Sequence, residues 1–191
     1  MNKHVFNAAS LYVTNRTKFN KQYARNELAR ELMHEIFLES ESRPDLAERI
    51  AIALLGHIPS PTKRGYDGKT KSGRPVEAKV RCFISVDGKF ENCTRLAFND
   101  ISRGIVDRYI ADQPLFVFPF FYDGHLAAIF TTEFKNIHKF YEARLASDKG
   151  GRCCFNLAAK YWANDAKVAF VNNDESIVKM LPKPLYDKVV G

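Results

Sequence analysis

The chain has 191 residues, of which 46% are hydrophobic and 13% aromatic, so it can form a packed core and is not expected to be disordered. No apolar run approaches the roughly 18 residues that cross a bilayer. The N-terminus has Asn and Thr where a signal peptide has its apolar centre. We therefore expect a cytoplasmic protein with no membrane partner, and we expect no organic cofactor.

The net charge of +7 is unevenly distributed. Residues 1–26 carry five basic and no acidic groups, whereas residues 27–60 carry three basic and seven acidic groups. Residues 61–81 carry seven basic groups, with Asp67 and Glu77 as the two acids. Basic residues around two isolated carboxylates are typical of a site that handles phosphate.

The sequence pattern of residues 1–56 predicts an arm followed by helices. Residues 1–21 have no clear period and are interpreted as a basic arm. Apolar residues at helical spacing predict a helix over 22–38, and Pro44 and Asp45 indicate the start of a second helix that ends at Gly56. We expect residues 22–56 to take part in dimerisation.

The segments 64–69 and 75–86 read as strands joined by a hairpin. The loop Lys71-Ser72-Gly73 has Gly at its last position, where a type I turn with a bulge requires a left-handed residue. This loop would place Asp67 and Glu77 nearly opposite one another.

The remaining chain predicts further helices and strands. Asn99 or Asp100 is expected to cap a helix that runs to about Asp112. Apolar patterning and turn residues then predict, in order, a buried strand at 115–121, a strand at 125–131, a helix at 133–146 and a strand at 166–171 with short helices. The expected fold is a single α/β domain over 1–191, with a central mixed β-sheet flanked by helices. Residues 57–191 would form its catalytic and DNA-recognition core.

The segment GYDGKTKSGRPVEAKV (65–80) carries the candidate chemistry. Magnesium prefers oxygen ligands and is usually held by one or two carboxylates, which Asp67 and Glu77 could supply. Glu77 and Lys79 are two apart on a strand, so both point to the same face, and Lys79 could hold an attacking water. Ala78 between them offers a backbone carbonyl.

This segment resembles the PD-(D/E)XK nuclease motif, with Asp67 as the first acid and Glu77-Ala78-Lys79 as the (D/E)XK element. The nine-residue gap between the acids and the downstream NDISRGIVDRYIADQPLFVFPFFYDGHLAAIFTTEF are most similar to type II restriction endonucleases of the PvuII type. The likeness spans about residues 50–165.

The resemblance implies that Asp67, Glu77 and the Ala78 carbonyl bind Mg²⁺, for which Mn²⁺ could substitute, while Lys79 positions water. Tyr66 stands where the family name has proline, and Arg64 stands where some members have an additional acid. The row Glu27, Glu31 and Glu35 is interpreted as a solvated helix face, with an extra carboxylate toward the metal as the alternative.

Two segments are candidates for base readout in double-stranded DNA: residues 95–103, around a predicted helix start, and residues 150–160 downstream. Lys69, Lys71 and Arg74 at the hairpin tip suit phosphate contacts, which position the protein. The candidate DNA-binding residues are Lys69, Lys71, Arg74, Arg81, Arg95, Asn99, Asp100, Arg103, Arg152, Asn156 and Lys160.

The leading hypothesis is a homodimeric, Mg²⁺-dependent type II restriction endonuclease that cuts both strands within a short palindromic site, because symmetric DNA is most simply read by a two-fold symmetric dimer. A phage or DNA-repair nuclease of the same fold, reading DNA structure, is the first alternative. The second is a basic DNA-binding protein without catalysis.

Overall fold

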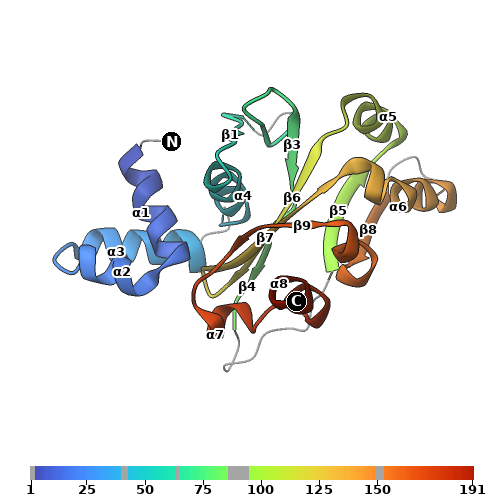
Figure 1. Ribbon diagram of the computed structural model, residues 1–191. Coiled ribbons are helices and arrows are strands. Elements are labelled where there is room, and N and C mark those ends of the chain that lie inside the picture. Colours follow the sequence, from blue (N-terminus) through green and yellow to red (C-terminus); the bar gives the residue numbers. More distant parts are fainter. Residues whose placement is uncertain (1–2, 40–42, 63–64, 86–94, 149–152) are drawn as a thin grey trace.

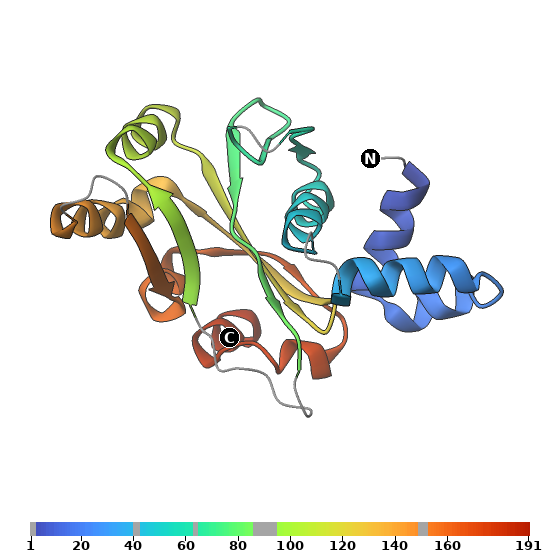
Figure 2. The same ribbon diagram turned by 180° about the vertical axis from the view of Figure 1, so that it is seen from behind.

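The computed structural model describes residues 3–39, 43–62, 65–85, 95–148 and 153–191. A mixed seven-stranded sheet runs through the molecule and has helices on both of its faces (Figures 1 and 2). The expected α/β class, with a central mixed sheet flanked by helices, is therefore confirmed. In the described part, no helix is both long and apolar enough to cross a membrane.

The order of strands in the main sheet is β1–β2–β3–β6–β7–β9, and β4 also pairs with β6. Strands β3 and β4 run parallel to β6, while the other neighbours are antiparallel. The strands are β1 (Ile58–Pro59), β2 (Gly68–Lys69), β3 (Pro75–Ala78), β4 (Arg81–Phe83), β6 (Leu115–Tyr122), β7 (His125–Glu133) and β9 (Lys167–Val171).

The two central strands, β6 and β7, were predicted correctly. Every residue of β6 after Leu115 is buried, as expected for a strand covered on both faces. Asp123 and Gly124 form the turn between the strands, and both have positive φ angles, of 44° and 72°. A two-residue loop with this backbone matches the twist of antiparallel strands.

The N-terminal segment is helical, so the prediction of an arm over 1–21 is wrong. Helices α1 (Lys3–Thr14) and α2 (Arg16–Gln22) bury Tyr12, Val13 and Phe19 against the sheet. The side chain of Asn15 caps α2 by accepting a hydrogen bond from Lys18 N. The spacing of Ala9, Tyr12 and Val13 is helical, but the polar residues between them hide the period.

The two helices predicted next are present, with shifted bounds. Helix α3 (Glu27–His34) begins after Asn26, whose side chain accepts from Ala29 N, five residues later than the predicted start. It continues into a π-helical turn, η1 (Glu35–Glu39), and α4 (Arg43–Leu54) follows. Gly56, just after α4, has a φ of 72°, in the left-handed region that ends helices.

The two faces of the main sheet bury two separate cores. Helices α1 to α4 cover one face, where Val76, Val117 and Ile129 are buried. An aromatic core fills the other face, and Phe116, Phe118 and Trp162 lie within it. The elements α5 (Arg103–Asp112), α6 (Phe134–Ser147), α7 (Glu175–Val178) and α8 (Lys183–Val190) pack around this second core.

A second, two-stranded sheet was only partly foreseen. Strand β5 (Arg95–Ile101) pairs antiparallel with β8 (Cys153–Ala158), which the sequence did not predict. Asn99 and Asp100 lie in β5 and do not cap α5, so that prediction is wrong. Ser102 is the cap, and its hydroxyl accepts from Ile105 N. Short 3-10 turns, η2 (Ala159–Tyr161) and η3 (Ala163–Asp165), follow β8.

Candidate active site

The hairpin that carries the motif forms as the sequence predicts. Thr70 N donates to Arg74 O at 2.8 Å, and Gly73 N donates to Thr70 O at 3.0 Å, so residues 71–73 form the loop. Gly73 has the required left-handed backbone, with a φ of 88°. Because Gly68 pairs with Val76, the register sets Asp67 opposite Glu77.

Direct contacts connect Asp67, Ala78, Glu77 and Lys79. Ala78 N donates a 2.8 Å hydrogen bond to Asp67 Oδ2, which fixes the first carboxylate against the backbone of β3. Lys79 Nζ lies 2.7 Å from Glu77 Oε1. The Glu77 side chain is only 10% exposed and that of Lys79 26% exposed, so water screens this pair less than a surface pair. The structure thus brings the four motif residues together.

A proline in the neighbouring strand explains why the predicted strand 75–86 is interrupted at Lys79. Ala78 pairs with Val117 and Arg81 with Phe120, so the same register continues from β3 into β4. Lys79 N donates to Val117 O at 2.9 Å, and the residue that would donate back to the Lys79 carbonyl is Pro119, which has no N–H. The next backbone N–H, that of Val80, faces Glu48 Oε1 at 3.5 Å. A helix carboxylate therefore reaches the backbone beside Lys79.

Glu48, on α4, is a third acid of the site that the sequence did not single out. Burial and the charge of Asp67 raise the pKa of Glu48 to about 7. Burial and the charge of Glu77 likewise raise the pKa of Asp67 to about 6, against the opposing effects of Lys79 and the Ala78 N–H. A hollow of about 90 Å³ lies against Asp45, Glu48 and Asp67.

The charge of Lys79 is stabilised by these acids. Burial lowers the pKa of an ammonium group, but Glu77, Asp67 and Glu48 together raise that of Lys79 above its ordinary value. Lys79 is therefore protonated at neutral pH. It can donate hydrogen bonds to a water or a phosphate oxygen, and it cannot accept a proton there.

Two tyrosines connect the site to helix α5. Tyr109 is buried and its hydroxyl is hydrogen-bonded to Glu77, and burial together with this carboxylate raises the tyrosine pKa. The Tyr66 hydroxyl donates to Asp112 Oδ2 at 2.9 Å, and the guanidinium of Arg108 lies over the Tyr66 ring. Glu77 thus contacts both Lys79 and Tyr109.

The donor set suits a hard divalent cation. Asp67 and Glu77 offer carboxylate oxygens, Ala78 offers a carbonyl, and waters would complete the shell of Mg²⁺. A cation would also relieve the repulsion that raises the pKa of Asp67 and Glu48. Across the described ranges, no three His, Cys, Asp or Glu side chains converge as a ready-made metal cage.

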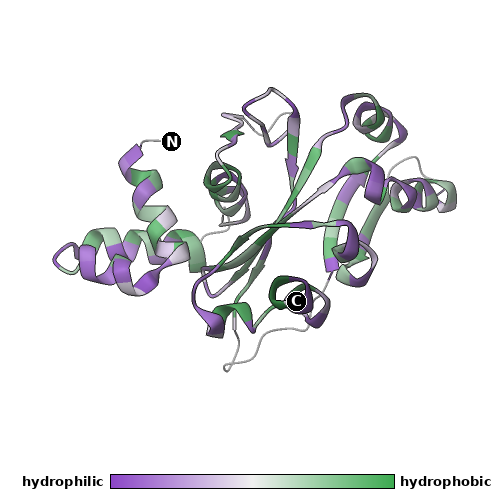
Figure 3. Ribbon diagram, viewed as in Figure 1, coloured by the Kyte–Doolittle hydropathy of each residue, from purple (hydrophilic) through white to green (hydrophobic). Residues whose placement is uncertain are grey.

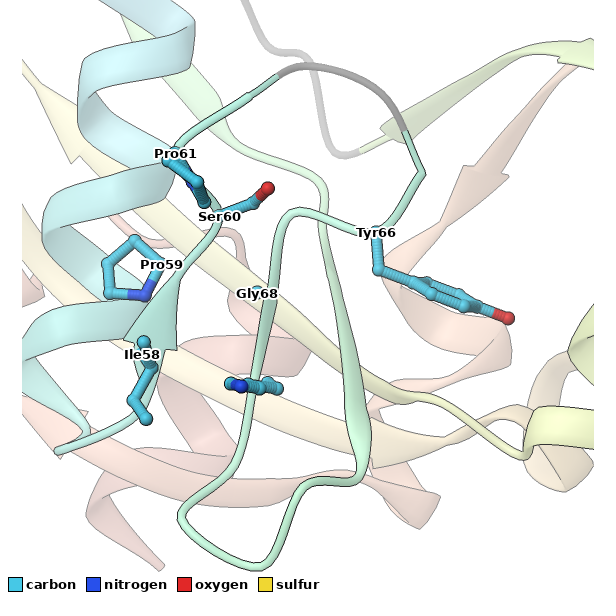
Figure 4. A pocket seen from close by; sticks show the side chains of 7 residues that line it. Ile58, Pro59, Ser60, Pro61, Tyr66 and Gly68 are labelled. Carbon is cyan, nitrogen blue, oxygen red and sulfur yellow. The ribbon is translucent and has the colours of Figure 1, made fainter.

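A pocket of about 360 Å³ lies beside Asp67 (Figure 4). Ile58, Pro59 and Pro61 give it apolar walls, and Lys69 adds a cation. Figure 4 shows Tyr66 extending away from Ile58 and Pro59. Tyr66, whose hydroxyl donates to Asp112, also lines this pocket.

Five of the basic residues predicted to bind DNA fall into two groups. Lys69 and Lys71 are exposed on the hairpin. The other three make internal contacts: Arg74 donates to Gln113 O at 2.7 Å, Arg81 donates to the Arg95 carbonyl, and Arg103 forms a two-pronged ion pair with Glu142 at 2.7 and 2.8 Å. These three positions therefore have structural partners already.

The two segments assigned to base readout are paired strands. Ala97 pairs with Asn156 and Arg95 with Ala158, so β5 and β8 form one antiparallel ribbon. Leu96, Phe98 and Leu157 are buried on its inner face.

The outer face of this β5–β8 ribbon carries the polar candidates. Asn99 and Asp100 form a bulge opposite Cys154, where Asp100 has a φ of 55°. Asn99, Asp100 and Asn156 are exposed. Lys160 follows the ribbon with its ammonium over the Tyr161 ring, while Arg152 lies outside the described residues, as does Arg64.

The row Glu27, Glu31 and Glu35 is exposed on α3 and η1, in the group of helices at the opposite end of the molecule from the β5–β8 ribbon (Figures 1 and 2). The solvated-face interpretation therefore fits the structure. The acid that faces the site comes from α4 instead. Glu48 is followed directly by Arg49, and no spacing to the motif marks it, so only the packing of α4 against the hairpin identifies it.

Comparison with known proteins does not assign a family. A scan of protein-family models finds no match to this chain, and a search of curated proteins finds no significant similarity.

Proposed function

We propose that the protein is a Mg²⁺-dependent endonuclease with a PD-(D/E)XK core, acting as a type II restriction enzyme on double-stranded DNA. The observation that carries the proposal is the convergence of Asp67, the Ala78 backbone and the Glu77–Lys79 pair on one hairpin. Paired carboxylates beside a protonated lysine suit a reaction in which negative charge develops on a phosphate.

Each residue has a definite task in this proposal. Asp67 and Glu77, with the Ala78 carbonyl, would hold Mg²⁺. When bound, the ion would neutralise phosphate charge and lower the pKa of a coordinated water. Lys79 would donate a hydrogen bond to the attacking water or to a phosphate oxygen. Tyr109 would keep Glu77 oriented through its hydroxyl, and Glu48 would add a third negative charge beside Asp67.

The proposed mode of sequence recognition rests on the β5–β8 ribbon. The major groove of B-DNA, about 12 Å wide, admits a two-stranded β-ribbon. Asn side chains suit adenine, with which an amide can form two hydrogen bonds, and Asn99 and Asn156 are both exposed on the ribbon. A homodimer would present two such ribbons to the halves of a palindromic site.

A plasmid-cleavage assay tests the function. We expect discrete DNA fragments in Mg²⁺ or Mn²⁺, DNA binding without cleavage in Ca²⁺, and loss of cleavage in excess EDTA. A smear, or selective cutting of branched DNA, would favour a phage or repair nuclease that reads DNA structure. Full activity in EDTA would reject the metal mechanism, and binding without cleavage in every metal would leave a non-catalytic DNA-binding protein.

A further inference from the structure

The pocket beside Asp67 has apolar walls that are open to solvent. Ile58 is 50% exposed, and Pro59 and Pro61 line the same cavity of about 360 Å³. Figure 3 shows hydrophobic colour in β1 beside pale and hydrophilic stretches of the hairpin. Because exposed apolar surface is unfavourable in water, a ligand that covers these walls with its own apolar groups would be favoured.

The wall formed by β1 is held close to the hairpin. Pro59 pairs with Gly68 in the antiparallel register of β1 and β2. A Cβ at Gly68 would lie 2.7 Å from the carbonyl oxygen of Ile58, so the strands approach one another as closely as glycine allows. The apolar wall therefore has a fixed place relative to the hairpin that carries Asp67.

The apolar pocket adjoins the acidic hollow against Glu48 and Asp67. Ser60 and Pro61 line both the pocket and the hollow. Ser60 N donates to the Asp67 carbonyl at 2.7 Å, which fixes this shared segment beside the first acid of the motif. A ligand that occupies both spaces would therefore have its charged group near the carboxylates and an apolar group directly next to it.

The hydroxyl groups of the described lining residues already have partners. The Tyr66 hydroxyl donates to Asp112 Oδ2 at 2.9 Å, and the Ser60 hydroxyl accepts from Thr62 N at 3.3 Å. Lys69, opposite Ile58 in the β1–β2 register, adds an exposed ammonium group to the lining. The three parts, an acidic hollow for a metal, apolar walls and a cation, match the phosphate–sugar–phosphate repeat of a nucleic-acid strand.

We propose that this pocket binds the deoxyribose next to the scissile phosphate and selects it over ribose. With the scissile phosphate at the metal, the sugar bonded to it lies in the adjoining pocket and the next phosphate lies near Lys69. The 2′ carbon of deoxyribose carries only hydrogens, which suit Ile58 and the prolines. A ribose 2′-hydroxyl there loses water and gains no hydrogen-bond partner. This inference rests on the proposed nuclease function and names the feature of the substrate that the pocket selects.

Sugar substitution at the cleavage position tests the pocket. The position is first mapped in a duplex by sequencing the fragment ends. The two sugars that flank the scissile phosphate are then changed one at a time to ribose or to 2′-fluoro-deoxyribose. At one of these positions ribose should slow cleavage by about tenfold or more, measured in Mg²⁺ with enzyme in excess. The 2′-fluoro sugar keeps the pucker of ribose but needs no hydrogen-bond partner, so it should be cut at close to the all-DNA rate.

The variant Ile58→Thr places a hydroxyl on the apolar wall and keeps a β-branched side chain in β1. It should decrease the ratio of the all-DNA rate to the ribose-substituted rate by about threefold or more, because the 2′-hydroxyl gains a partner. Val168→Thr is the matched control. Val168 is 37% exposed in β9, the strand at the other edge of the main sheet, and its substitution should leave this ratio unchanged.

Three results would overturn the inference: equal rates for ribose and deoxyribose at both positions, equal slowing by the fluoro and hydroxyl sugars, or an unchanged ratio in Ile58→Thr. In each of these cases the all-DNA duplex is still cut, so the proposed nuclease function stands. A wild type that leaves the all-DNA duplex intact in Mg²⁺ would reject the nuclease function, and the inference with it.

Discussion

Asp67, Glu77 and Glu48 gather around one ammonium group, that of Lys79. Asp67 precedes β2, Glu77 lies in β3 and Glu48 lies in α4, and one ammonium group cannot neutralise all three acids. Burial, together with the excess negative charge, raises the pKa of Glu48 to about 7 and that of Asp67 to about 6. The folded site therefore disfavours the charged form of both carboxyl groups.

The raised pKa of Glu48 predicts an unusual dependence of stability on pH. Because the folded pKa lies above the unfolded value, the folded state holds the extra proton, and stability is lost as pH rises from about 4.5 to about 7. In EDTA, the melting temperature of Glu48→Gln should be closest to that of the wild type at pH 5, where Glu48 is neutral in the folded state, and should exceed it at pH 8. Each unit of pKa difference corresponds to about 1.4 kcal/mol.

Saturating Mg²⁺ should reverse the difference at pH 8, because the ion stabilises the charged carboxylate. Glu175→Gln is the control, since the Glu175 side chain is 88% exposed and its effect should not change with pH. A wild type that gains stability relative to Glu48→Gln between pH 5 and pH 8 in EDTA would contradict this account of the site.

At this scale the sequence identifies the residues that are close along the chain. Asp67, Glu77 and Lys79 follow from strand alternation and a short loop, both of which are local. Glu48 and Tyr109 reach the site only because α4 and α5 pack beside the hairpin. Nothing within a window of sequence encodes those contacts.

At the scale of elements, the hairpin loop controls the distance between the two acids. Gly73 has a φ of 88°, and a side chain there would meet no neighbouring atom, so the effect of Gly73→Ala is backbone strain alone. A left-handed residue with a Cβ costs about 1–2 kcal/mol. We expect Gly73→Ala to lower the melting temperature by about 2–8 °C and to slow cleavage.

Gly104→Ala is the matched control. Gly104 lies in the first turn of α5, has open space around its Cα and does not have a left-handed backbone. Alanine favours helices over glycine, so this substitution should leave the melting temperature unchanged or raise it. Equal decreases in melting temperature for Gly73→Ala and Gly104→Ala would show that the left-handed backbone of the loop does not cause the loss of stability.

The β5–β8 ribbon gives a prediction about specificity. A base contact contributes about 1–3 kcal/mol of discrimination, whereas a phosphate contact weakens binding to every sequence. Asn99→Ala and Asn156→Ala should therefore weaken binding to the cognate duplex and leave binding to a scrambled duplex nearly unchanged. Lys71→Ala should weaken both and reduce the salt slope by about one unit. Titrations on both duplexes at several salt concentrations measure this.

Equal losses of affinity on both duplexes for the two asparagine variants, with folding intact, would show that the ribbon does not read bases.

The pairing of β5 with β8 is where prediction from sequence was weakest. Asn99 and Asp100 are good helix caps by residue type, but their segment is drawn into a strand by Leu96 and Phe98, which are buried in the aromatic core. Ser102 then provides the cap.

At the scale of the whole molecule, the main sheet separates the N-terminal helices from the β5–β8 ribbon. The N-terminal helices cover one face, while the ribbon and α5 lie beyond the opposite core (Figures 1 and 2). The hairpin that carries Asp67 and Glu77 belongs to the edge formed by β1, β2 and β3. The central strands were predictable because β6 and β7 are continuous apolar runs. The packing of α1 and α2 was not, because a mixed polar and apolar helix has a weak sequence pattern.

The most direct test of the central claim is the cleavage rate of Lys79→Ala on supercoiled plasmid, in Mg²⁺ and with enzyme in excess of DNA. Lys79 touches Glu77 at 2.7 Å and is proposed to act on the reacting water or phosphate, so its loss should slow cleavage by about 10²-fold or more. DNA affinity measured in Ca²⁺ should stay close to that of the wild type. A Lys79→Ala variant that cuts at the wild-type rate would mean that Asp67, Glu77 and Lys79 are not the active centre.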